Sequence, residues 1–352
     1  MMDTTITRRD VIRQGKRLAL ATPFLSLITY DGANAARRLT VLTGATMGTT
    51  YSVKISKMPA NVDRFEMENA IVRILETVNA QMSTYRLESE LSKFNAESSA
   101  SWVEISPDTL AVVKEALRIA RLTDGAFDPT IGPLVDLWGF GAGSTRQGVP
   151  SKRHIGEILK RIGHNNVLTM SSPPSIAKSQ PGIRIDLSGI AKGFGVDKIA
   201  KYLERAGVEY YLAEIGGELR GRGYSQRGDV WRVGIERPLG ARRTVQRVVR
   251  LGGQALATSG DYRILFERKG ISYSHILDPR DGQPVQHGLA SVTVIAPTAM
   301  QADALSTALM VLGPEAGFRL AKRENIAAFF IAKTANGFTE KASPEFVRYL
   351  IA

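Results

Sequence analysis

A glycine-rich junction at residues 183–197 constrains this chain more than any other stretch of its sequence. Apolar and polar residues alternate over 183–187, and a period of two predicts a half-buried strand. From 190 to 206 the apolar residues recur at helical spacing, with Ser188 in front of them as a suitable N-cap. The sequence therefore predicts a strand that passes directly into a helix through Ser188 and Gly189.

The junction is also poor in side chains. Gly189, Gly193 and Gly195 surround Lys192 in the opening turns of the predicted helix, and Asp186 precedes them. One interpretation is a tight packing point between helix and sheet, with the lysine in solvent. The other is a backbone platform for a phosphorylated ligand, because the first N–H groups of a helix can bind an anion. The spacing matches neither the dinucleotide fingerprint G-x-G-x-x-G nor the P-loop G-x-x-x-x-G-K-[ST].

Composition narrows the classes of partner. The 352 residues carry a net charge of +12, and 43% of them are hydrophobic, which suits a globular protein with a substantial core. The sequence has no cysteine, which excludes disulfides and thiolate metal sites. A basic surface suits an anionic small ligand, an acidic protein or an anionic membrane face. Because RNP-type aromatic patterns and zinc-finger spacings are absent, no nucleic-acid partner is expected.

Residues 1–35 are typical of an export signal. Arg8 and Arg9 form a twin arginine before a moderately apolar run at 18–30, and the small residues at 33–35 offer a cleavage site. The apolar run is shorter than the roughly 20 residues that span a membrane. We therefore expect a twin-arginine signal that is cleaved near its end, and a periplasmic or exported protein. A basic amphipathic helix of the folded domain is the alternative.

A second candidate site lies on a helix that is predicted to begin after Thr298, which forms a capping box with Gln301. Asp303, Ser306 and Thr307 follow at spacings of three and four, so they share one helical face. One interpretation is an acidic residue that suits the helix dipole, beside two packing hydroxyls. The other is a set of oxygen ligands for a hard cation such as Mg²⁺, which also binds substrate phosphates.

Several motifs in a fixed order resemble those of the FAD:protein FMN transferases, the ApbE-type flavin transferases. The resemblance runs from Thr43 to Leu312. Its motifs are TMGTTY at 46–51, STYRLESELSKFN at 83–95, AFDPT at 126–130, IDLSGIAKGFGVD at 185–197, ATSGDY at 257–262, HILDPRDGQP at 275–284 and ADALSTA at 302–308. Three positions depart from the family pattern: Glu214, Glu218 and Asp281.

The resemblance implies an α/β (α+β) fold of mixed, largely antiparallel sheets with flanking helices. This architecture is similar to the T-fold-like one of that family and contains no Rossmann unit. One domain is expected over residues 36–352, after the signal. Periodicity and caps further predict helices at 66–82 and from 107 to a stop at 124–125, and strands at 38–55, 231–236 and 291–296.

The resemblance also implies Mg²⁺-dependent transfer of FMN from FAD to a threonine hydroxyl of an acceptor protein, with release of AMP. Lys192 would add a second positive charge, and His275 is the candidate general base because its ordinary pKa lies near the working pH. The implied metal ligands are the carbonyl of Gly189 with Asp303, Ser306 and Thr307. The implied FAD-binding residues are Met47, Tyr85, Ala126, Phe127, Asp128, Asp186, Lys192 and Leu277.

The implied partners are FAD and acceptor flavoproteins that carry an S/T-G-A-T-like segment, expected as subunits of membrane-associated or periplasmic redox systems. Two other functions stay open. A Mg²⁺-dependent FAD pyrophosphatase would use the same site with water in place of the threonine. A non-catalytic periplasmic flavin-binding protein would bind FAD without releasing AMP.

Overall fold

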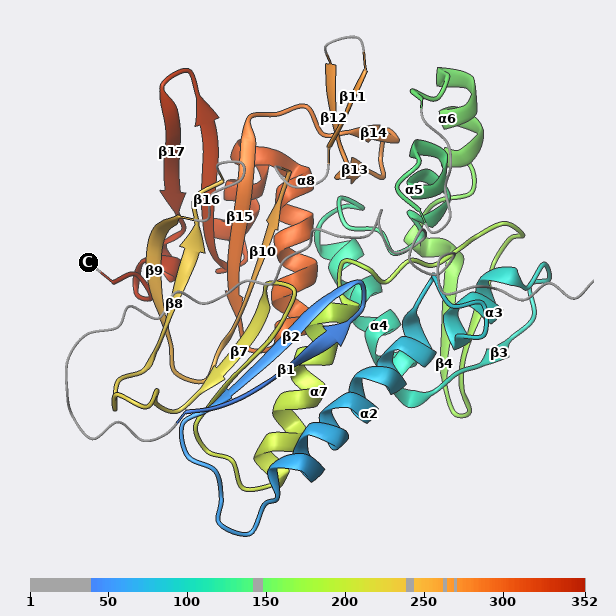
Figure 1. Ribbon diagram of the computed structural model, residues 1–352. Helices are drawn as coiled ribbons and strands as arrows, with labels where there is room; N and C mark the ends of the chain where they lie inside the picture. The colour runs from blue at the N-terminus through green and yellow to red at the C-terminus, as the bar shows by residue number, and fades with distance from the viewer. Residues whose placement is uncertain (1–38, 142–147, 239–243, 262–264, 269–270, 352) are drawn as a thin grey trace, which may run out of the picture.

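The computed structural model describes residues 39–141, 148–238, 244–261, 265–268 and 271–351 (Figure 1). Its main element is an open eight-stranded sheet in the order β1-β2-β6-β7-β10-β15-β16-β17, and every neighbouring pair in it is antiparallel. The strands are β1 (Thr40–Thr46), β2 (Thr49–Ile55), β6 (Tyr211–Ile215), β7 (Glu218–Arg222), β10 (Ala255–Gly260), β15 (Leu289–Ala296), β16 (Ala327–Thr334) and β17 (Gly337–Ala342).

Four smaller sheets surround the main one. They are formed by β3 (Val103–Glu104), β5 (Pro174–Lys178) and β4 (Val167–Ser171); by β8 (Trp231–Glu236) and β9 (Val245–Leu251); by β11 (Leu265–Arg268) and β12 (Ile271–Ser274); and by β13 (Leu277–Asp278) and β14 (Gln283–Pro284). These pairs are also antiparallel. The predicted fold class, with largely antiparallel sheets and no Rossmann unit among the described residues, is confirmed.

The helices lie mainly on one side of the sheet. Figure 1 shows α7 and α8 beside each other against the sheet, with α2 and α4 further out. The helices are α2 (Arg64–Met82), α3 (Glu90–Ala96), α4 (Pro107–Leu122), α5 (Gly132–Trp138), α6 (Lys152–Leu159), α7 (Ala191–Arg205), α8 (Ala299–Arg323) and α9 (Pro344–Val347), with a 3-10 turn η1 (His164–Asn166). The predicted helices at 66–82 and 107–124 correspond to α2 and α4.

Alternation along the strands gives the sheet two buried faces. In β10, Ala257 packs in the cluster on the helical side, whereas Leu256 belongs to the cluster on the opposite side. That opposite cluster is closed by Trp231 of the β8–β9 hairpin and Phe346 of α9. Because both faces are covered by apolar side chains, the sheet is a fixed support for the helices that carry the candidate site.

The predicted strand at 38–55 is instead a hairpin. Met47 and Gly48 form its two-residue loop between β1 and β2, with φ angles of 47° and 70°. Two positive φ angles in a two-residue loop are typical of the turn that matches the twist of paired strands. The sequence pattern missed the turn because only one of its two loop residues is glycine.

The junction at 183–197 differs from its prediction in two ways. Residues 183–187 alternate in burial as expected, but they form no strand among the described residues. The side chain of Asn95 accepts from the N–H of Ile185 at 2.7 Å and donates to its carbonyl at 2.8 Å, so an amide replaces the neighbouring strand. The N-cap of α7 is Ile190, not Ser188, and it makes no side-chain capping bond.

Helix α8 begins as predicted, because Thr298 accepts from the N–H of Gln301 at 3.2 Å. The predicted stop at Gly313 is a break inside α8, where φ is 78° and the helix resumes at Pro314. None of the helices in the described ranges is long and apolar enough to cross a membrane. The predicted signal at 1–35 lies outside the described residues.

Candidate active site

The two predicted halves of the site meet where α7 lies against α8. A side chain at Gly193 would place its Cβ 2.2 Å from the carbonyl oxygen of Ala299, so glycine is required for this approach. The N–H of Gly193 donates to Oδ2 of Asp303 at 3.0 Å. We call this contact region and the residues that border it the α7–α8 seam, which comprises Gly189, Lys192, Gly193, Asp197, Glu218, Ala299, Asp303 and Thr307.

Lys192 lies between two buried carboxyl groups of the seam. Its Nζ is 3.7 Å from Oδ1 of Asp303 and 3.7 Å from Oε1 of Glu218, and it donates to the carbonyl of Ser188 at 3.2 Å. Glu218 stands at the start of β7, directly after the Gly216-Gly217 turn. The lysine is therefore paired, and the close approach at Gly193 agrees with the packing point of the first interpretation.

Burial sets the protonation of these three groups. Desolvation raises the pKa of Glu218 to about 8, although the charge of Lys192 opposes the shift. Burial likewise raises the pKa of Asp303 above its ordinary value against the pull of Lys192. Burial alone would lower the pKa of Lys192, but Asp303 and Glu218 outweigh it and hold the pKa above its usual range. The lysine therefore stays charged, whereas burial favours the protonated form of Glu218.

The metal-ligand candidates of the two helices are neighbours. A Cβ built on Gly189 would lie 3.4 Å from Oγ1 of Thr307 and 3.2 Å from Cε2 of Phe127. The backbone of Gly189 thus faces the third turn of α8 across a gap that a side chain would fill. Asp303 precedes Thr307 by one helical turn, so both side chains and the glycine backbone border one small space.

A chain of hydroxyl groups orients Thr307. The Ser306 hydroxyl donates to the carbonyl of Asp303 at 2.9 Å, which uses its single proton. Ser259 of β10, 2.9 Å from Ser306, must then be the donor to Ser306, and Thr307, 3.2 Å from Ser259, must donate to Ser259. This direction leaves the lone pairs of the Thr307 oxygen available to a ligand.

The donors in this space suit a hard cation. One carboxylate, one hydroxyl oxygen and one backbone carbonyl are the oxygen ligands that Mg²⁺ accepts, and the ion commonly takes its remaining ligands from water and substrate phosphates. Among the described residues there is no group of three His, Cys, Asp or Glu side chains that could hold a metal by itself. The residues therefore fit a magnesium ion that binds together with a phosphate-bearing substrate.

The predicted FAD-binding loop at 126–130 lies beside this space. Ala126, Phe127 and Asp128 are all buried. The carboxylate of Asp128 accepts from the N–H and hydroxyl of Thr130 at 2.8 and 2.6 Å, and from the N–H of His164 at 2.8 Å. Asp128 thus fixes the conformation of the loop, and the backbone and Phe127 are the parts of it that lie near Gly189.

Asp186 connects this loop to the glycine junction. Its N–H donates to the carbonyl of Pro129 at 2.7 Å, and its Oδ1 accepts from the N–H of Ser188 at 2.8 Å. Desolvation, followed by the negative charges of Asp186 and Asp136, raises the pKa of the Tyr85 phenol. Tyr85 therefore lies within electrostatic reach of the junction, and with 66% of its surface exposed it is free to cover a ligand.

Met47 reaches the junction from the β1–β2 hairpin loop. A Cβ on Gly195 would lie 3.1 Å from Cε of Met47, so the methionine packs against the first turns of α7. Met47 is half-buried and contacts apolar clusters on both sides of α7. The structure thus places the hairpin loop against the helix that carries Lys192, as the prediction for Met47 requires.

His275 lies between β12 and β13, where its half-buried ring meets the edge of Phe140 at 6.4 Å between centroids and 72° between planes. Leu277, two residues on, is buried with Leu134 and Trp138 in a small cluster that joins α5 and α6 to the β13–β14 hairpin. We call Tyr85, Phe127, Asp128, His275 and Leu277 together the rim of the site. Its histidine is held by aromatic packing.

Sequence reasoning missed some residues that organise the site. Ser259 lies in the ATSGDY motif and Asn95 ends the STYRLESELSKFN motif, so each was in a recognised segment without an assigned role. Glu218, one of the departures from the family pattern, proves to be a partner of Lys192. His164, to which the sequence assigned no role, donates its backbone N–H to Asp128. For Ser259 and Asn95 the available signal was membership of a motif, whereas no local pattern indicated His164.

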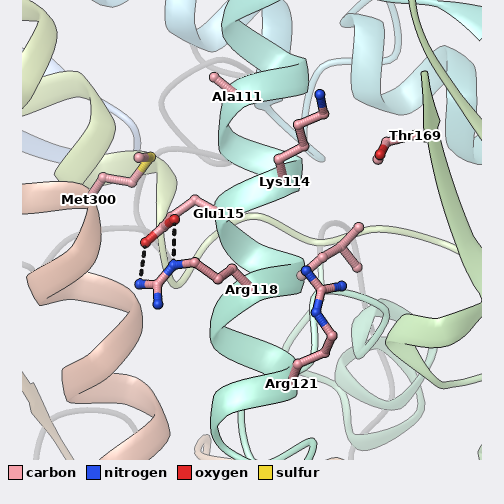
Figure 2. A pocket seen from close by; sticks show the side chains of 8 residues that line it. Ala111, Lys114, Glu115, Arg118, Arg121, Thr169 and Met300 are labelled. Atoms are coloured by element: carbon pink, nitrogen blue, oxygen red, sulfur yellow. Dashed lines mark hydrogen bonds and ion pairs between the residues drawn. The ribbon is translucent and has the colours of Figure 1, made fainter. Parts of the chain in front are cut away.

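A separate surface pocket of about 600 Å³ lies along α4 (Figure 2). Figure 2 shows Lys114, Arg118 and Arg121 along one stretch of α4, with Glu115 paired to Arg118 at 2.7 and 2.9 Å. Thr169 of β4 and Met300 of α8 complete part of its wall. None of the predicted site residues lines this pocket, so it is distinct from the candidate active site.

Comparison with known proteins identifies the family of the chain. A model of the ApbE family matches residues 47–330. The FAD:protein FMN transferase of Vibrio cholerae is 43% identical over 92% of this chain and 97% of its own length. The solved structure of flavin transferase ApbE from Vibrio cholerae has a TM-score of 0.83 at 43% identity, over 89% of this chain and 99% of that one. The ApbE protein of Thermotoga maritima has a TM-score of 0.80 at 32% identity, over 90% and 100%.

The fold is that of solved flavin transferases, and the curated relatives are transferases by name. The chain belongs to the ApbE family, and it is an enzyme of the same transferase class.

Proposed function

We propose that this protein transfers FMN from FAD to a threonine hydroxyl of an acceptor protein in a Mg²⁺-dependent reaction. The observation that carries the proposal is the seam, where Gly189 faces Thr307 and Lys192 lies between Asp303 and Glu218. The names of the relatives support the flavin substrate. The metal, the threonine and the release of AMP are our inference from the donor set and the motifs.

In this proposal the pyrophosphate of FAD lies between the Gly189–Lys192 turn and the face of α8 that carries Asp303 and Thr307. Those two residues, with the carbonyl of Gly189, would hold the magnesium, and Ser306 would support Thr307 through Ser259. Magnesium would supply positive charge that offsets the charge growing on the phosphate oxygens. Lys192, 3.7 Å from Asp303, would add a fixed cation beside the same space.

The transfer balances without a further reactant. The threonine oxygen of the acceptor forms a bond to the phosphorus of the FMN half, and the bond from that phosphorus to the AMP phosphate oxygen breaks. His275 accepts the proton of the threonine hydroxyl, because an imidazole that is neutral near pH 7 can act as a base. AMP leaves with the bonding electron pair. The products are a threonyl phosphodiester of FMN and AMP.

The rim residues would hold the flavin and adenosine portions of FAD. Tyr85, which is exposed, is available to stack on the isoalloxazine ring. Met47 and the backbone of 126–128 would line the site, and Asp186 would orient the loop beside the pyrophosphate. Leu277 packs in the aromatic cluster that supports His275. The acceptor would present an S/T-G-A-T-like segment at the open side of the rim.

The test uses the full-length protein, FAD, Mg²⁺ and a peptide with an S/T-G-A-T segment. We expect mass spectrometry to find an FMN-sized adduct on the peptide threonine, with one AMP released per adduct. Asp303→Asn should lower the rate by about a thousandfold or more, because it removes the only carboxylate of the ligand set. His275→Ala should lower the rate by about a hundredfold while FAD still binds.

The same assay separates the two other functions. Rapid release of AMP and FMN without any peptide would favour the pyrophosphatase and reject the transferase. Tight FAD binding without AMP release under any condition would favour the non-catalytic binding protein. The paired Lys192, the buried Asp303 and the oriented Thr307 favour catalysis, since binding alone has no need for a desolvated charge.

We also propose that the protein is exported by a twin-arginine signal at 1–35 and acts in the periplasm. The support is the sequence pattern alone. N-terminal sequencing of the protein purified from a periplasmic fraction should find a start near residue 36, and an intact Met1 in the cytoplasmic fraction would reject export.

A further inference from the structure

A carboxylate outside the predicted ligand set joins the two helices of the seam. Asp197 of α7 accepts from the N–H of Ala299 at 3.0 Å through Oδ1 and from the N–H of Met300 at 2.9 Å through Oδ2. Both oxygens therefore bind the first turn of α8. Arg220 of β7 donates to Oδ1 at 2.8 Å, so the same carboxylate also ties the sheet to both helices.

This contact lies close in the fold to the metal-ligand candidates. Asp197 follows Gly193 by one turn of α7, and Gly193 touches both Ala299 and Asp303. Asp303 in turn follows Ala299 by one turn of α8. A helix is stiff over two turns, so the residue that fixes its first turn also fixes the axial position and rotation of the next two.

The electrostatics of the contact explain why a carboxylate is needed. The N-terminus of α8 carries unpaired N–H groups and a partial positive charge, and Arg220 approaches the same point. Asp197 neutralises both. Without its charge, the guanidinium of Arg220 would face the positive end of α8, and the two elements would separate at the place where their alignment determines the site.

We infer that Asp197 is a positioning residue of the metal site, which aligns Asp303 and Thr307 of α8 with Lys192 of α7 and with Gly189 just before α7, by holding the first turn of α8. The inference rests on the proposed function, because it assumes a divalent ion at these residues. It assigns Asp197 no contact with substrate or metal. Residues that orient metal ligands commonly change metal affinity by about 10–100-fold when they are replaced.

The test measures metal binding directly. Mn²⁺ is titrated into the full-length protein in the presence of saturating FAD, and the EPR signal of free Mn²⁺ gives the dissociation constant. Asp197→Asn keeps the shape of the side chain but loses its charge and one acceptor. We expect its Mn²⁺ dissociation constant to rise by about tenfold. The Mg²⁺ concentration for half-maximal transfer should rise in parallel.

Thr298→Ala is the matched control, since Thr298 caps the same turn of α8 through the N–H of Gln301 but does not cross the seam. We expect it to lower stability and leave the Mn²⁺ dissociation constant within about twofold. If the Mn²⁺ dissociation constant rose equally in both variants, Asp197 would act only as an ordinary helix cap, and the inference would be overturned. An unchanged Mn²⁺ dissociation constant in Asp197→Asn would also overturn it.

Asp197→Glu keeps the test decisive if Asp197→Asn does not fold. It keeps the negative charge beside Arg220 but adds a methylene group, which displaces the carboxylate from the N–H groups of Ala299 and Met300, so a smaller rise in the Mn²⁺ dissociation constant, about threefold, is expected. No rise in a folded Asp197→Glu protein would then overturn the inference. If the unaltered protein binds no Mn²⁺ even with FAD, the metal dependence of the proposed function is rejected. That outcome is distinct from a failure of the inference about Asp197.

Discussion

The α7–α8 seam and the rim are the two parts of the proposed site, and they are built differently. The seam is formed by backbone contact and buried charge: Gly193 against Ala299, Lys192 between Asp303 and Glu218, and Asp197 on the end of α8. The rim is formed by loops that depend on small local networks, such as Asp128 with His164. If the proposed function holds, a change in the seam should affect stability and metal binding together, whereas a change at the rim should lower the rate without altering the metal requirement.

The largest effect is expected from Gly193→Ala, compared with Gly195→Ala. The new Cβ at 193 would lie 2.2 Å from the backbone oxygen of Ala299, which cannot move without displacing α8. We expect a loss of about 1–3 kcal/mol in the free energy of unfolding and a Mg²⁺ requirement raised by at least about tenfold. Urea unfolding and the Mg²⁺ dependence of the rate measure these.

Gly195→Ala is the control on the same helix. Its Cβ would meet Cδ1 of Ile215 at 3.0 Å and Cε of Met47 at 3.1 Å, which are ends of flexible side chains. Alanine also gains about 1 kcal/mol of helix propensity over glycine. The variant should stay within about 1 kcal/mol of the original stability. A Gly195→Ala protein as unstable as Gly193→Ala would show that the close approach of α7 and α8 is not what requires glycine.

The buried carboxyl group of Glu218 in the seam should also make the stability of the protein depend on pH. The pKa of Glu218 is about 8 in the folded protein against an ordinary value of 4.5. Below pH 4.5 the group is protonated in both states. Between pH 4.5 and 8 only the folded state holds the proton, so the free energy of unfolding falls as pH rises through this window.

Glu218→Gln removes this dependence, because glutamine resembles the protonated acid at every pH. In metal-free buffer we expect the stability of the variant relative to the original protein to increase by about 1 kcal/mol per pH unit between pH 5 and 8. Urea unfolding at several pH values measures the difference. Parallel stability curves for the two proteins would mean that Glu218 is ionised in the fold, and that Lys192 dominates over burial.

The sequence predicted more of the candidate site residues than of the residues that hold them in place. Asp303, Ser306 and Thr307 followed from helical spacing and the capping box at Thr298, and the glycine junction does meet them. These patterns are local in sequence, and helical geometry places residues at such spacings on one face of the helix. The fold class was predicted from the order of the motifs and not from the predicted strands. Strand periodicity missed the turn at Met47 and predicted a strand at 183–187, where the segment is irregular.

What escaped prediction depends on partners that are distant in sequence. Asn95 replaces a strand beside Ile185 from 90 positions away, and Ser259 orients Thr307 from 48 positions away. Asp197 binds the first turn of α8 across about 100 residues. Each of these is a short polar side chain whose role depends on hydrogen bonds to a distant segment, and nothing in the local periodicity records which groups will form them.

The smallest effect is expected in the rim, from Trp138→Phe. The indole N–H of Trp138 donates to the carbonyl of Gly282 at 2.8 Å, which ties α5 to the β13–β14 hairpin beside His275. Phenylalanine keeps the packing and leaves that buried carbonyl without its donor. We expect a loss of about 1 kcal/mol in stability, a fall of a few-fold in the transfer rate, and an unchanged Mg²⁺ requirement.

Trp231→Phe is the matched control, because Trp231 also donates its indole N–H to a backbone carbonyl, that of Arg222, at 3.0 Å. It lies in the cluster on the opposite face of the sheet, away from both parts of the site. We expect a similar loss of stability with no change in rate, measured under the same assay. If Trp138→Phe shifted the Mg²⁺ requirement as the seam variants do, the rim and the seam would be one coupled unit, since the hairpin would then transmit its displacement to α8.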